Sequence, residues 1–163
     1  MSPSSSEAAI IREAAARDLP TLRDVAYRSK AYWGYDQAFM DTVESSLAPE
    51  EGELAEGVYV IEHGGAMTGF YAFKTIDGSF FLHSLFVVPE KIGCGVGKRL
   101  WHHAVDFARR TAHRHFMIES DPNAEEFYLH LGARRVGEIV SEISGRSLPL
   151  LRFECPTRNA PVT

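Results

Sequence analysis

Two segments near the N-terminus carry apolar residues at the three- and four-residue spacing of amphipathic helices. The first follows Asp18 and Pro20, residues typical of a helix start, and stops at Gly34. The second follows Asp36 and stops before Pro49. The sequence therefore predicts a helical pair whose buried faces carry Leu22, Val25, Ala26, Tyr32 and Trp33 in the first helix, and Phe39, Met40, Val43 and Leu47 in the second.

Three runs of β-branched and aromatic residues follow, at positions 58–61, 68–76 and 80–88. Such runs favour strands, and the intervals between them contain the turn sequences His63-Gly64-Gly65 and Asp77-Gly78. Short turns of this kind join neighbouring antiparallel strands. The middle of the chain is therefore predicted to form a three-stranded antiparallel meander.

The pattern then changes, because helical and strand-like segments alternate. A glycine-rich segment, residues 93–97, leads into a helix with one apolar face. The later elements are a strand at 115–120, a helix from Asp121-Pro122 to Gly132, and strands at 136–140 and 148–153. Together these elements predict a fold of the α/β class in the broad sense (α+β), with a mixed, mostly antiparallel sheet of six or seven strands and about four flanking helices.

The composition is that of an ordinary soluble domain: hydrophobic residues make up 45% and charged residues 24% of the 163 residues. We expect one domain over residues 1–163, with loosely ordered ends at 1–8 and 156–163. The net charge of −5 provides no overall positive field for nucleic acid or an anionic membrane, and no apolar run is long enough to span a bilayer. We therefore expect a cytoplasmic protein. Cys94 and Cys155 do not form a disulfide framework.

Three alternating glycines, Gly93, Gly95 and Gly97, precede the helix after the meander. A loop without Cβ atoms can turn its N–H groups outward, and a helix N-terminus adds partial positive charge, so this segment favours an anion such as a pyrophosphate. The nearby cations are Lys91, Lys98 and Arg99. The structural alternative is a loop that lets the helix pack closely on a strand.

Two nucleotide-binding motifs fit this loop less well. A Walker loop requires Ser or Thr after Gly-Lys, whereas Arg99 follows Gly97-Lys98 here. A dinucleotide site requires the loop after the first strand of its sheet. Glu119 has nearly the spacing of the acid that binds ribose in such sites, but several strands precede the loop.

The segment Leu85-Phe86-Val87-Val88-Pro89, followed by Ile92-Gly93-Cys94-Gly95-Val96-Gly97, resembles motif A of the GCN5-related N-acetyltransferases (GNAT). Residues 123–133 resemble their motif B, and the resemblance covers roughly residues 8–155. It implies acetyl-coenzyme A (acetyl-CoA) as cosubstrate, with its pyrophosphate on the motif A amides and its pantetheine arm on the preceding strand. The implied cofactor contacts are Leu85, Phe86, Val87, Ile92, Gly93, Cys94, Gly95, Val96, Gly97, Lys98 and Asn123. Ile92 stands where the family usually has Gln or Arg, so only backbone contacts are implied there.

The resemblance also implies a catalytic acid. Tyr128 matches the motif B tyrosine that commonly protonates the coenzyme A sulfur, and its ordinary pKa of about 10 keeps it protonated at neutral pH. The helical pattern places Tyr128 at the edge of the apolar stripe formed by Ala124, Phe127 and Leu131. The alternative is a tyrosine that only packs its ring.

His83 is the candidate general base. It lies on the strand before motif A, with Phe81, Leu85 and Val87 predicted on the same face, and histidine titrates near neutral pH. The alternative is a hydrogen-bonded structural histidine. Glu62 and His63 are weaker candidates, because turn residues are their simplest interpretation.

Aromatic residues gather near the predicted break between the first two helices. Tyr32, Trp33 and Tyr35 are the candidate acceptor-binding residues, since aromatic faces can hold a cationic amine. Trp33 and Phe39 also fit the helical core pattern, which favours a core position for both. The polar loop 141–147 is a further candidate, because the family often selects its substrate there.

The sequence thus predicts an N-acetyltransferase that passes an acetyl group from acetyl-CoA to a primary amine of a small molecule or peptide, by direct attack in a ternary complex. The alternatives are a catalytically weak acyl-CoA-binding sensor and a nucleotide-binding domain that uses the same glycines. No metal site is predicted, because the histidines at 102, 103, 113 and 115 lack further ligands. Exposed sheet edges would allow a homodimer.

Overall fold

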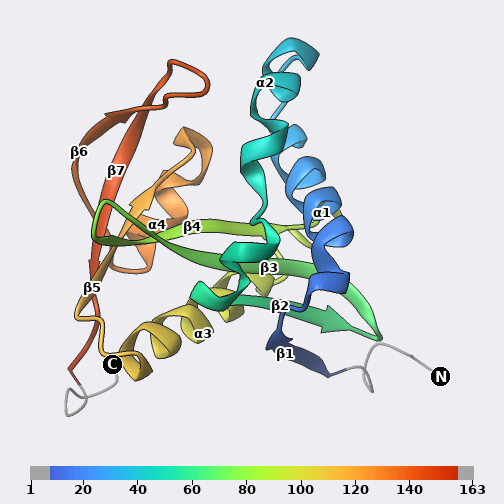
Figure 1. The fold of residues 1–163 in the computed structure, drawn as a ribbon, viewed down its shortest axis with the longest axis horizontal. Coiled ribbons are helices and arrows are strands. Elements are labelled where there is room, and N and C mark those ends of the chain that lie inside the picture. Colours follow the sequence, from blue (N-terminus) through green and yellow to red (C-terminus); the bar gives the residue numbers. More distant parts are fainter. Residues whose placement is uncertain (1–7, 158–163) are drawn as a thin grey trace.

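The computed structural model describes residues 8–157 and contains one seven-stranded sheet with strand order β1-β2-β3-β4-β5-β7-β6 (Figure 1). The strands are β1 (Ala9–Glu13), β2 (Val58–His63), β3 (Ala66–Ile76), β4 (Ser79–Val87), β5 (His115–Glu119), β6 (Arg134–Val140) and β7 (Ser147–Glu154). The helices are α1 (Leu19–Ala31), α2 (Gln37–Leu47), α3 (Val96–Arg110) and α4 (Glu125–His130), with short 3-10 helices at Ala16–Asp18, Glu51–Glu56, Pro89–Lys91 and Pro122–Ala124. The predicted fold class is confirmed. The predicted loose ends lie outside the described residues, apart from residues 8, 156 and 157.

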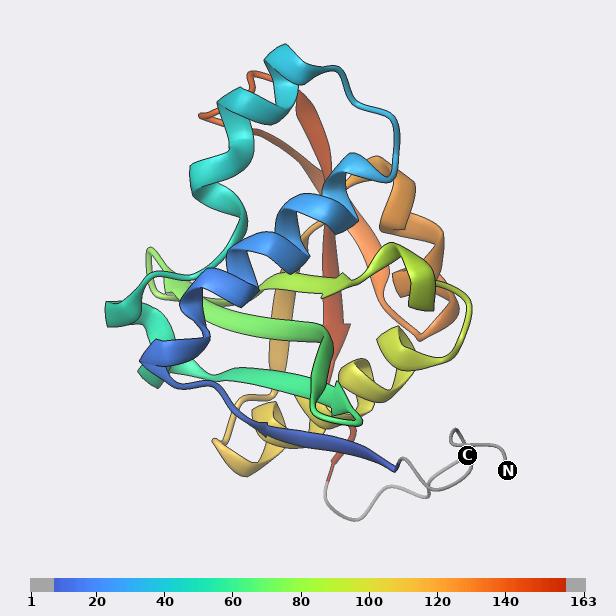
Figure 2. The same ribbon diagram turned by 90° about the vertical axis from the view of Figure 1, so that its right-hand side faces the viewer.

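Helices cover both faces of the sheet (Figures 1 and 2). On one face, the apolar side of α1 packs on β2 and β3. On the other face, α3 and α4 pack on β2 to β5 and β7. The fully buried side chains that join these layers include Leu22, Val25, Phe70, Tyr71, Phe73, Leu100, Trp101 and Phe116.

The sheet has two parts that meet between β4 and β5. All other neighbouring strands are antiparallel, but β4 and β5 are parallel and share one register pair, Phe81 with Met117. In Figure 1, β5 and β7 run across the direction of β2, β3 and β4. The two strands therefore diverge after this pair and leave an opening between their carboxyl-terminal halves.

A β-bulge in β4 changes which side chains share a face. Ser84 pairs with Ala72 and Leu82 pairs with Phe73, so His83 is an extra residue without a partner on β3. A bulge shifts the alternation of side chains by one position. Leu82, rather than His83, therefore joins Leu85 and Val87 on the α3 face, and the predicted face shared by His83, Leu85 and Val87 is wrong.

The helical pair forms as predicted, with changes at its ends. The Asp36 carboxylate accepts a hydrogen bond from the Phe39 N–H at 2.8 Å and caps α2. The first helix ends at Ala31, before Tyr32 and Trp33, which are 52% and 43% exposed. The predicted core position of Trp33 is therefore wrong, because the helical spacing was extended two residues past the helix end.

Neither β1 nor the 3-10 helix Glu51–Glu56 was predicted. The apolar run Ile10-Ile11 is too short to show a period, and β1 becomes a strand through its pairing with β2, where Ile11 lies opposite Ile61. Arg12 on β1 also donates two hydrogen bonds to Asp18, at 2.8 and 2.9 Å. Asp18 thus joins β1 to the start of α1 instead of capping the helix.

Replacing Asp18 by Asn tests this junction. The Asp18 carboxylate also accepts the Ala15 N–H at 2.8 Å, and Arg12 lowers its pKa from 3.8 to about 2. We expect Asp18→Asn to lower the free energy of unfolding by roughly 1–3 kcal/mol at pH 7, measured by urea denaturation. The lowered pKa stabilises the wild type above about pH 4, and this stabilisation is lost as the pH falls toward 2.

The matched control is Asp24→Asn, because Asp24 is exposed and its closest approach to Arg28 is 3.9 Å. We expect a change below about 0.5 kcal/mol for this variant. Equal effects of the two variants, or a difference between Asp18→Asn and wild type that stays constant down to pH 2, would contradict the assignment.

Candidate active site

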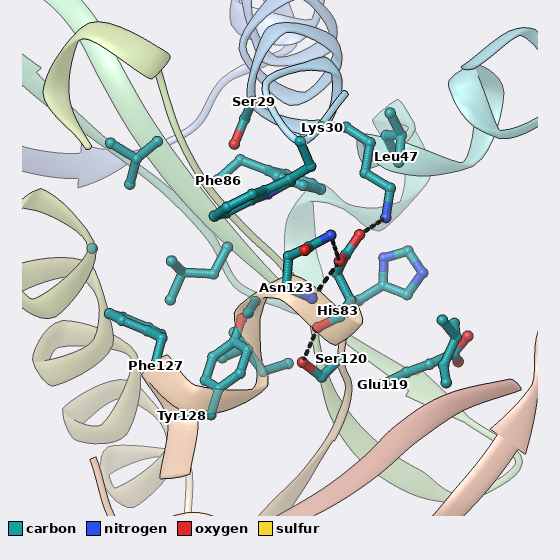
Figure 3. Close-up of a pocket in the computed structure, with 18 of the residues that line it drawn as sticks. Ser29, Lys30, Leu47, His83, Phe86, Glu119, Ser120, Asn123, Phe127 and Tyr128 are labelled. Carbon is teal, nitrogen blue, oxygen red and sulfur yellow. Dashed lines mark hydrogen bonds and ion pairs between the residues drawn. The ribbon is translucent and has the colours of Figure 1, made fainter. Parts of the chain in front are cut away.

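A cavity of about 490 Å³ lies at the opening between β4 and β5 (Figure 3). Its walls come from segments far apart in the sequence: α1 and α2, the second half of β4, the glycine loop, the end of β5, α4 and the β6–β7 loop. The divergence of two strands thus gathers side chains from these seven segments around one space.

The glycine loop lines one end of this cavity. Gly93 and Gly95 have φ values of +83° and +85°, in the left-handed region that favours glycine, and Gly95 precedes the first residue of α3. Among the described residues, the N–H groups of Gly95, Val96, Gly97 and Lys98 have no hydrogen-bond acceptor. Four free donors at the N-terminus of a fifteen-residue helix suit a phosphate group.

Gly97 has a packing role as well. A Cβ atom at this position would lie 3.3 Å from the Phe127 ring and 3.7 Å from Val87. The glycine therefore allows α3 to approach α4 and β4 closely. Both interpretations of the loop apply here, because its first two glycines shape the backbone and the third permits close packing.

Most of the predicted cofactor contacts line the cavity. They are Leu85, Phe86, Val87, Ile92, Gly93, Gly95, Gly97, Lys98 and Asn123. Cys94 is exposed and Val96 is buried in the core, so the structure does not place their side chains on the cavity wall. Any contact from these two residues would come from their backbone.

The edge of β4 offers further backbone groups. The Val88 N–H donates to the Thr68 carbonyl on the β3 side at 2.9 Å. Because residues of an antiparallel pair alternate in direction, Leu85 and Val87 turn their N–H and C=O groups away from β3 and toward the opening. β5 does not pair with this part of β4. These groups can therefore bond an extended amide chain.

Tyr128 lies on the α4 side of the cavity (Figure 3). The residue is 6% exposed, and its ring packs 5.8 Å from Trp101 and 5.2 Å from Phe127. Its predicted place at the edge of the apolar stripe is wrong, because Pro122–Ala124 forms a 3-10 helix and the α-helical period starts only at Glu125. The Tyr128 hydroxyl has no hydrogen bond within residues 8–157, and burial raises its pKa above the ordinary value.

His83 and Glu119 lie together on the opposite side of the cavity (Figure 3). Burial and the charge of Lys74 lower the pKa of His83, against the effect of Glu53, so the imidazole is neutral at pH 7. Burial and Glu142 raise the pKa of Glu119, while Lys30 opposes the shift. From the sequence, Glu119 was a candidate only as a ribose ligand. Its position at the end of a buried strand, just before motif B, was the sequence signal that could have placed it in the site.

The hydrogen bonds of Ser84 determine the tautomer of His83. The Ser84 hydroxyl donates to the Leu47 carbonyl oxygen at 3.0 Å and lies 3.3 Å from Nδ1 of His83. Since its single proton is directed to Leu47, the Ser84 oxygen accepts from Nδ1–H. The lone pair of His83 is then on Nε2, which can accept a proton.

A polar network closes the end of the cavity near the α1–α2 connection. The Asp121 carboxylate forms an ion pair with Lys30 and accepts hydrogen bonds from the Tyr35 hydroxyl and from Nδ2 of Asn123, at 2.9 Å each. Burial alone would raise the pKa of Asp121, but the hydrogen bond and charge of Lys30 outweigh it and hold the pKa below its ordinary value. Arg146 donates to the Tyr35 oxygen at 3.2 Å.

Four predicted ligand-binding residues lie at or near this end of the cavity, and two of them belong to the network. Both hydrogens of the Asn123 amide nitrogen are engaged, by Asp121 and by Tyr35 at 3.1 Å, so only its amide oxygen is free for a ligand. Tyr35 holds the network together behind the cavity wall, and Trp33 lines the cavity itself. Tyr32 lies outside, with its ring edge-on to Trp33 at 5.1 Å.

The weaker candidates and the histidine pairs lie elsewhere. Glu62 accepts a hydrogen bond from Arg12, and His63 bonds the Thr68 hydroxyl. His103 bonds Tyr71, and His113 stacks on the Phe80 ring. Within the described range, no three His, Cys, Asp or Glu side chains gather closely enough to hold a metal ion, and no helix is long and apolar enough to cross a membrane.

Residues 20–146 match the profile of the acetyltransferase (GNAT) domain. The chain belongs to the GNAT family of acetyltransferases. The resemblance seen in motifs A and B is therefore confirmed over most of the chain. The acyl donor of this family is acetyl-CoA, which agrees with the free donors of the glycine loop and the open edge of β4. None of the curated proteins compared with the chain matches it.

Solved structures of other GNAT proteins share the fold. A GCN5-related N-acetyltransferase from Rhodopseudomonas palustris is 18% identical, with a TM-score of 0.75 over 89% of this chain and 94% of that one. The PaiA N-acetyltransferase from Thermoplasma acidophilum, solved with coenzyme A, is 17% identical, with a TM-score of 0.72 over 90% and 99%. Ard1 from Thermoplasma volcanium is 18% identical, with a TM-score of 0.69 over 92% and 99%. At these identities, the likeness shows the fold.

Replacing Gly95 by Ala tests the anion-binding end of the cavity. An alanine at φ +85° is strained, and we expect the loop to change its backbone conformation to relieve that strain. This change would reorient the free N–H groups at the start of α3. We expect the dissociation constant of coenzyme A to rise about tenfold, measured by calorimetric titration.

The matched control is Gly78→Ala in the β3–β4 turn, where φ is +80° and a Cβ would likewise meet no atom. The Gly78→Ala variant has the same kind of backbone strain, but at a position outside the cavity. Unchanged coenzyme A affinity in Gly95→Ala, or an equal loss in both variants, would contradict the assignment of the loop.

Proposed function

We propose that the protein transfers an acetyl group from acetyl-CoA to a primary amine of a small molecule or peptide, by direct attack in a ternary complex. The observation that carries this proposal is the arrangement along the cavity. Free N–H donors lie at one end, an open strand edge follows, and Tyr128 faces His83 and Glu119 beyond it. This order matches the pyrophosphate, pantetheine and thioester of acetyl-CoA.

The proposed cofactor contacts follow the cavity wall. The pyrophosphate binds the N–H groups at the start of α3, near Lys98. The pantetheine amides bind Leu85 and Val87, in place of the strand pairing that β5 does not supply. Acetyl transfer needs a neutral amine, donors for the developing oxyanion and a proton for the departing thiolate.

Each proton in the step has a proposed partner. The amine nitrogen attacks the acetyl carbonyl carbon, the carbon–sulfur bond breaks, and the amide forms. Tyr128 gives its hydroxyl proton to the departing sulfur, and its raised pKa keeps that proton in place until then. His83 accepts the proton of the amine on Nε2.

His83 is preferred to Glu119 as the base because its contact with Ser84 leaves the lone pair on Nε2. A lowered pKa keeps the imidazole neutral, which is its proton-accepting form. A raised pKa makes the Glu119 carboxylate a stronger base, so Glu119 is the second candidate for this role. Glu119 lies on the same side of the cavity as His83, so a Glu119 variant is the comparison for a His83 variant.

The proposal is tested by a thiol-release assay with acetyl-CoA over classes of primary amines, next to calorimetric titration of acetyl-CoA. We expect tight binding and thiol release with one amine class. Binding without release for any amine would favour an acyl-CoA-binding sensor and contradict the enzyme. Binding of adenosine nucleotides as tightly as acetyl-CoA would favour a nucleotide-binding domain.

Replacing Tyr128 by Phe removes only the hydroxyl. We expect kcat to fall about 10²-fold or more, with the dissociation constant of coenzyme A within about twofold of wild type, because an acid acts in the transition state. Tyr71→Phe is the control, since it removes a buried hydroxyl that bonds His103 outside the cavity. An unchanged kcat in Tyr128→Phe would remove Tyr128 from the mechanism.

The pH dependence identifies the base. Because the pKa of His83 lies below 6.5, we expect kcat/KM to be constant near pH 7 and to fall at lower pH, as the imidazole gains a proton. His83→Gln loses this acid limb along with about 10² in rate, whereas Glu119→Gln keeps the limb. The reverse pattern, with the limb lost in Glu119→Gln and kept in His83→Gln, would assign the base to Glu119.

A further inference from the structure

Arg146 lines the acceptor end of the cavity and has no acidic partner. It is half-buried at the base of the β6–β7 loop, where its carbonyl accepts the Ser141 N–H at 2.8 Å. Its guanidinium lies 4.9 Å from the Tyr35 ring centre and 4.8 Å from that of Phe39. One of its N–H groups donates to the Tyr35 oxygen, and within residues 8–157 no carboxylate lies within 4.0 Å.

The charges around this stack of rings do not balance. Tyr35 and Phe39 are stacked 4.3 Å apart, and Lys30 lies 5.2 Å from the Tyr35 ring centre. Two cations, Lys30 and Arg146, therefore share one aromatic stack, and within residues 8–157 Asp121 is the single anion in contact with it. Asp121 pairs with Lys30, and Glu119 acts on Lys30 from a longer distance. Arg146 is therefore the cation of this cluster that lacks an anionic partner in the described range.

Two hydroxyl groups beside Arg146 can also donate to an anion. Ser141 and Ser144 line the cavity. The Ser141 hydroxyl oxygen accepts the backbone N–H groups of Ile143 and Ser144, and the Ser144 hydroxyl oxygen accepts that of Arg146. Neither hydroxyl donates a hydrogen bond to a residue of the described range. A planar guanidinium with free donors, in a cavity that two free hydroxyls also line, suits the two oxygens of a carboxylate.

Much of the opposite wall at the acceptor end is apolar. Trp33, Phe39, Val43 and Leu47 contribute to it from α2 and the segment before α2, next to the polar Ser46. Figures 1 and 2 place the β6–β7 loop and the α1–α2 connection at the same end of the molecule. An acceptor between them would meet an apolar wall along its body and Arg146 at its anionic group.

We propose that Arg146 binds a carboxylate of the acceptor, so that the acceptor is an amine with one carboxylate and an apolar body, such as an amino acid with an aliphatic or aromatic side chain. This inference rests on the proposed acetyl transfer, since it names the acceptor class of that reaction. Arg146 is one cation without an anionic partner in the described range, which favours a singly charged carboxylate over a doubly charged phosphate group.

The test compares leucine, phenylalanine and methionine with three analogues of each: the carboxamide, the decarboxylated amine and the aminophosphonate. The amine of the carboxamide is less basic than that of the amino acid, and the decarboxylated amine is more basic, so the pair separates loss of the carboxylate from a change in amine pKa. We expect kcat/KM for the best amino acid to exceed that of both uncharged analogues about tenfold or more.

Variants then assign the effect to Arg146. We expect Arg146→Gln to lower kcat/KM for the amino acid about tenfold, leave the decarboxylated amine within about twofold, and keep the wild-type affinity for coenzyme A. Arg146→Lys should retain part of the preference, because it keeps the charge without the planar fork. Arg134→Gln is the control, since Arg134 is exposed on β6, outside the cavity, and its contact with Glu154 is 3.9 Å long.

Three results would overturn the inference while the acetyl transfer stands: equal rates for the amino acid and its uncharged analogues, a preference for the aminophosphonate, or an equal loss for all acceptors in Arg146→Gln. Absence of thiol release with every amine would instead contradict the proposed function. In that case, calorimetric titration of the amino acid into the coenzyme A complex of wild type and Arg146→Gln tests the carboxylate site without turnover. Equal binding by the two proteins would then overturn the site as well.

Discussion

The pairing of β4 with β5 at one position is the constraint on which the site depends. Strands that stayed paired beyond Phe81 and Met117 would satisfy each other's backbone groups and close the sheet. Because they diverge, Leu85 and Val87 keep free N–H and C=O groups, and the start of α3 is exposed at the same opening. The cavity is therefore a consequence of the sheet topology. The backbone creates the space, and the surrounding side chains line it.

Burial then determines the protonation states in this space. It raises the pKa of Tyr128 and Glu119 and lowers that of His83, so each group is displaced toward its neutral form. A neutral tyrosine can donate a proton and a neutral histidine can accept one. The network around Asp121 is the exception, because Lys30 keeps that carboxylate charged and fixes α1 to the end of β5. The charged cluster lies at the acceptor end, and the neutral groups lie where the acyl group would react.

The sequence predicted what depends on local pattern and missed what depends on contacts between distant segments. The helical pair, the meander and the glycine loop followed from periodicity and turn residues. The bulge at His83 was not predictable, since an extra residue shows no signal until β3 pairs with β4. The 3-10 turn before α4 moved Tyr128 from the edge of a stripe into the core. The partners of Asp121 could not be found either, because Lys30 and Tyr35 precede it by 91 and 86 residues along the chain.

The most direct test of the central claim is calorimetric titration of the wild-type protein with acetyl-CoA and, in parallel, with ADP, which has the pyrophosphate but lacks the pantetheine arm. If the open edge of β4 binds that arm, acetyl-CoA binds with one site per chain and at least about a hundredfold more tightly than ADP. Equal affinities would contradict the role of the diverging strands, and no binding of acetyl-CoA would contradict the account as a whole.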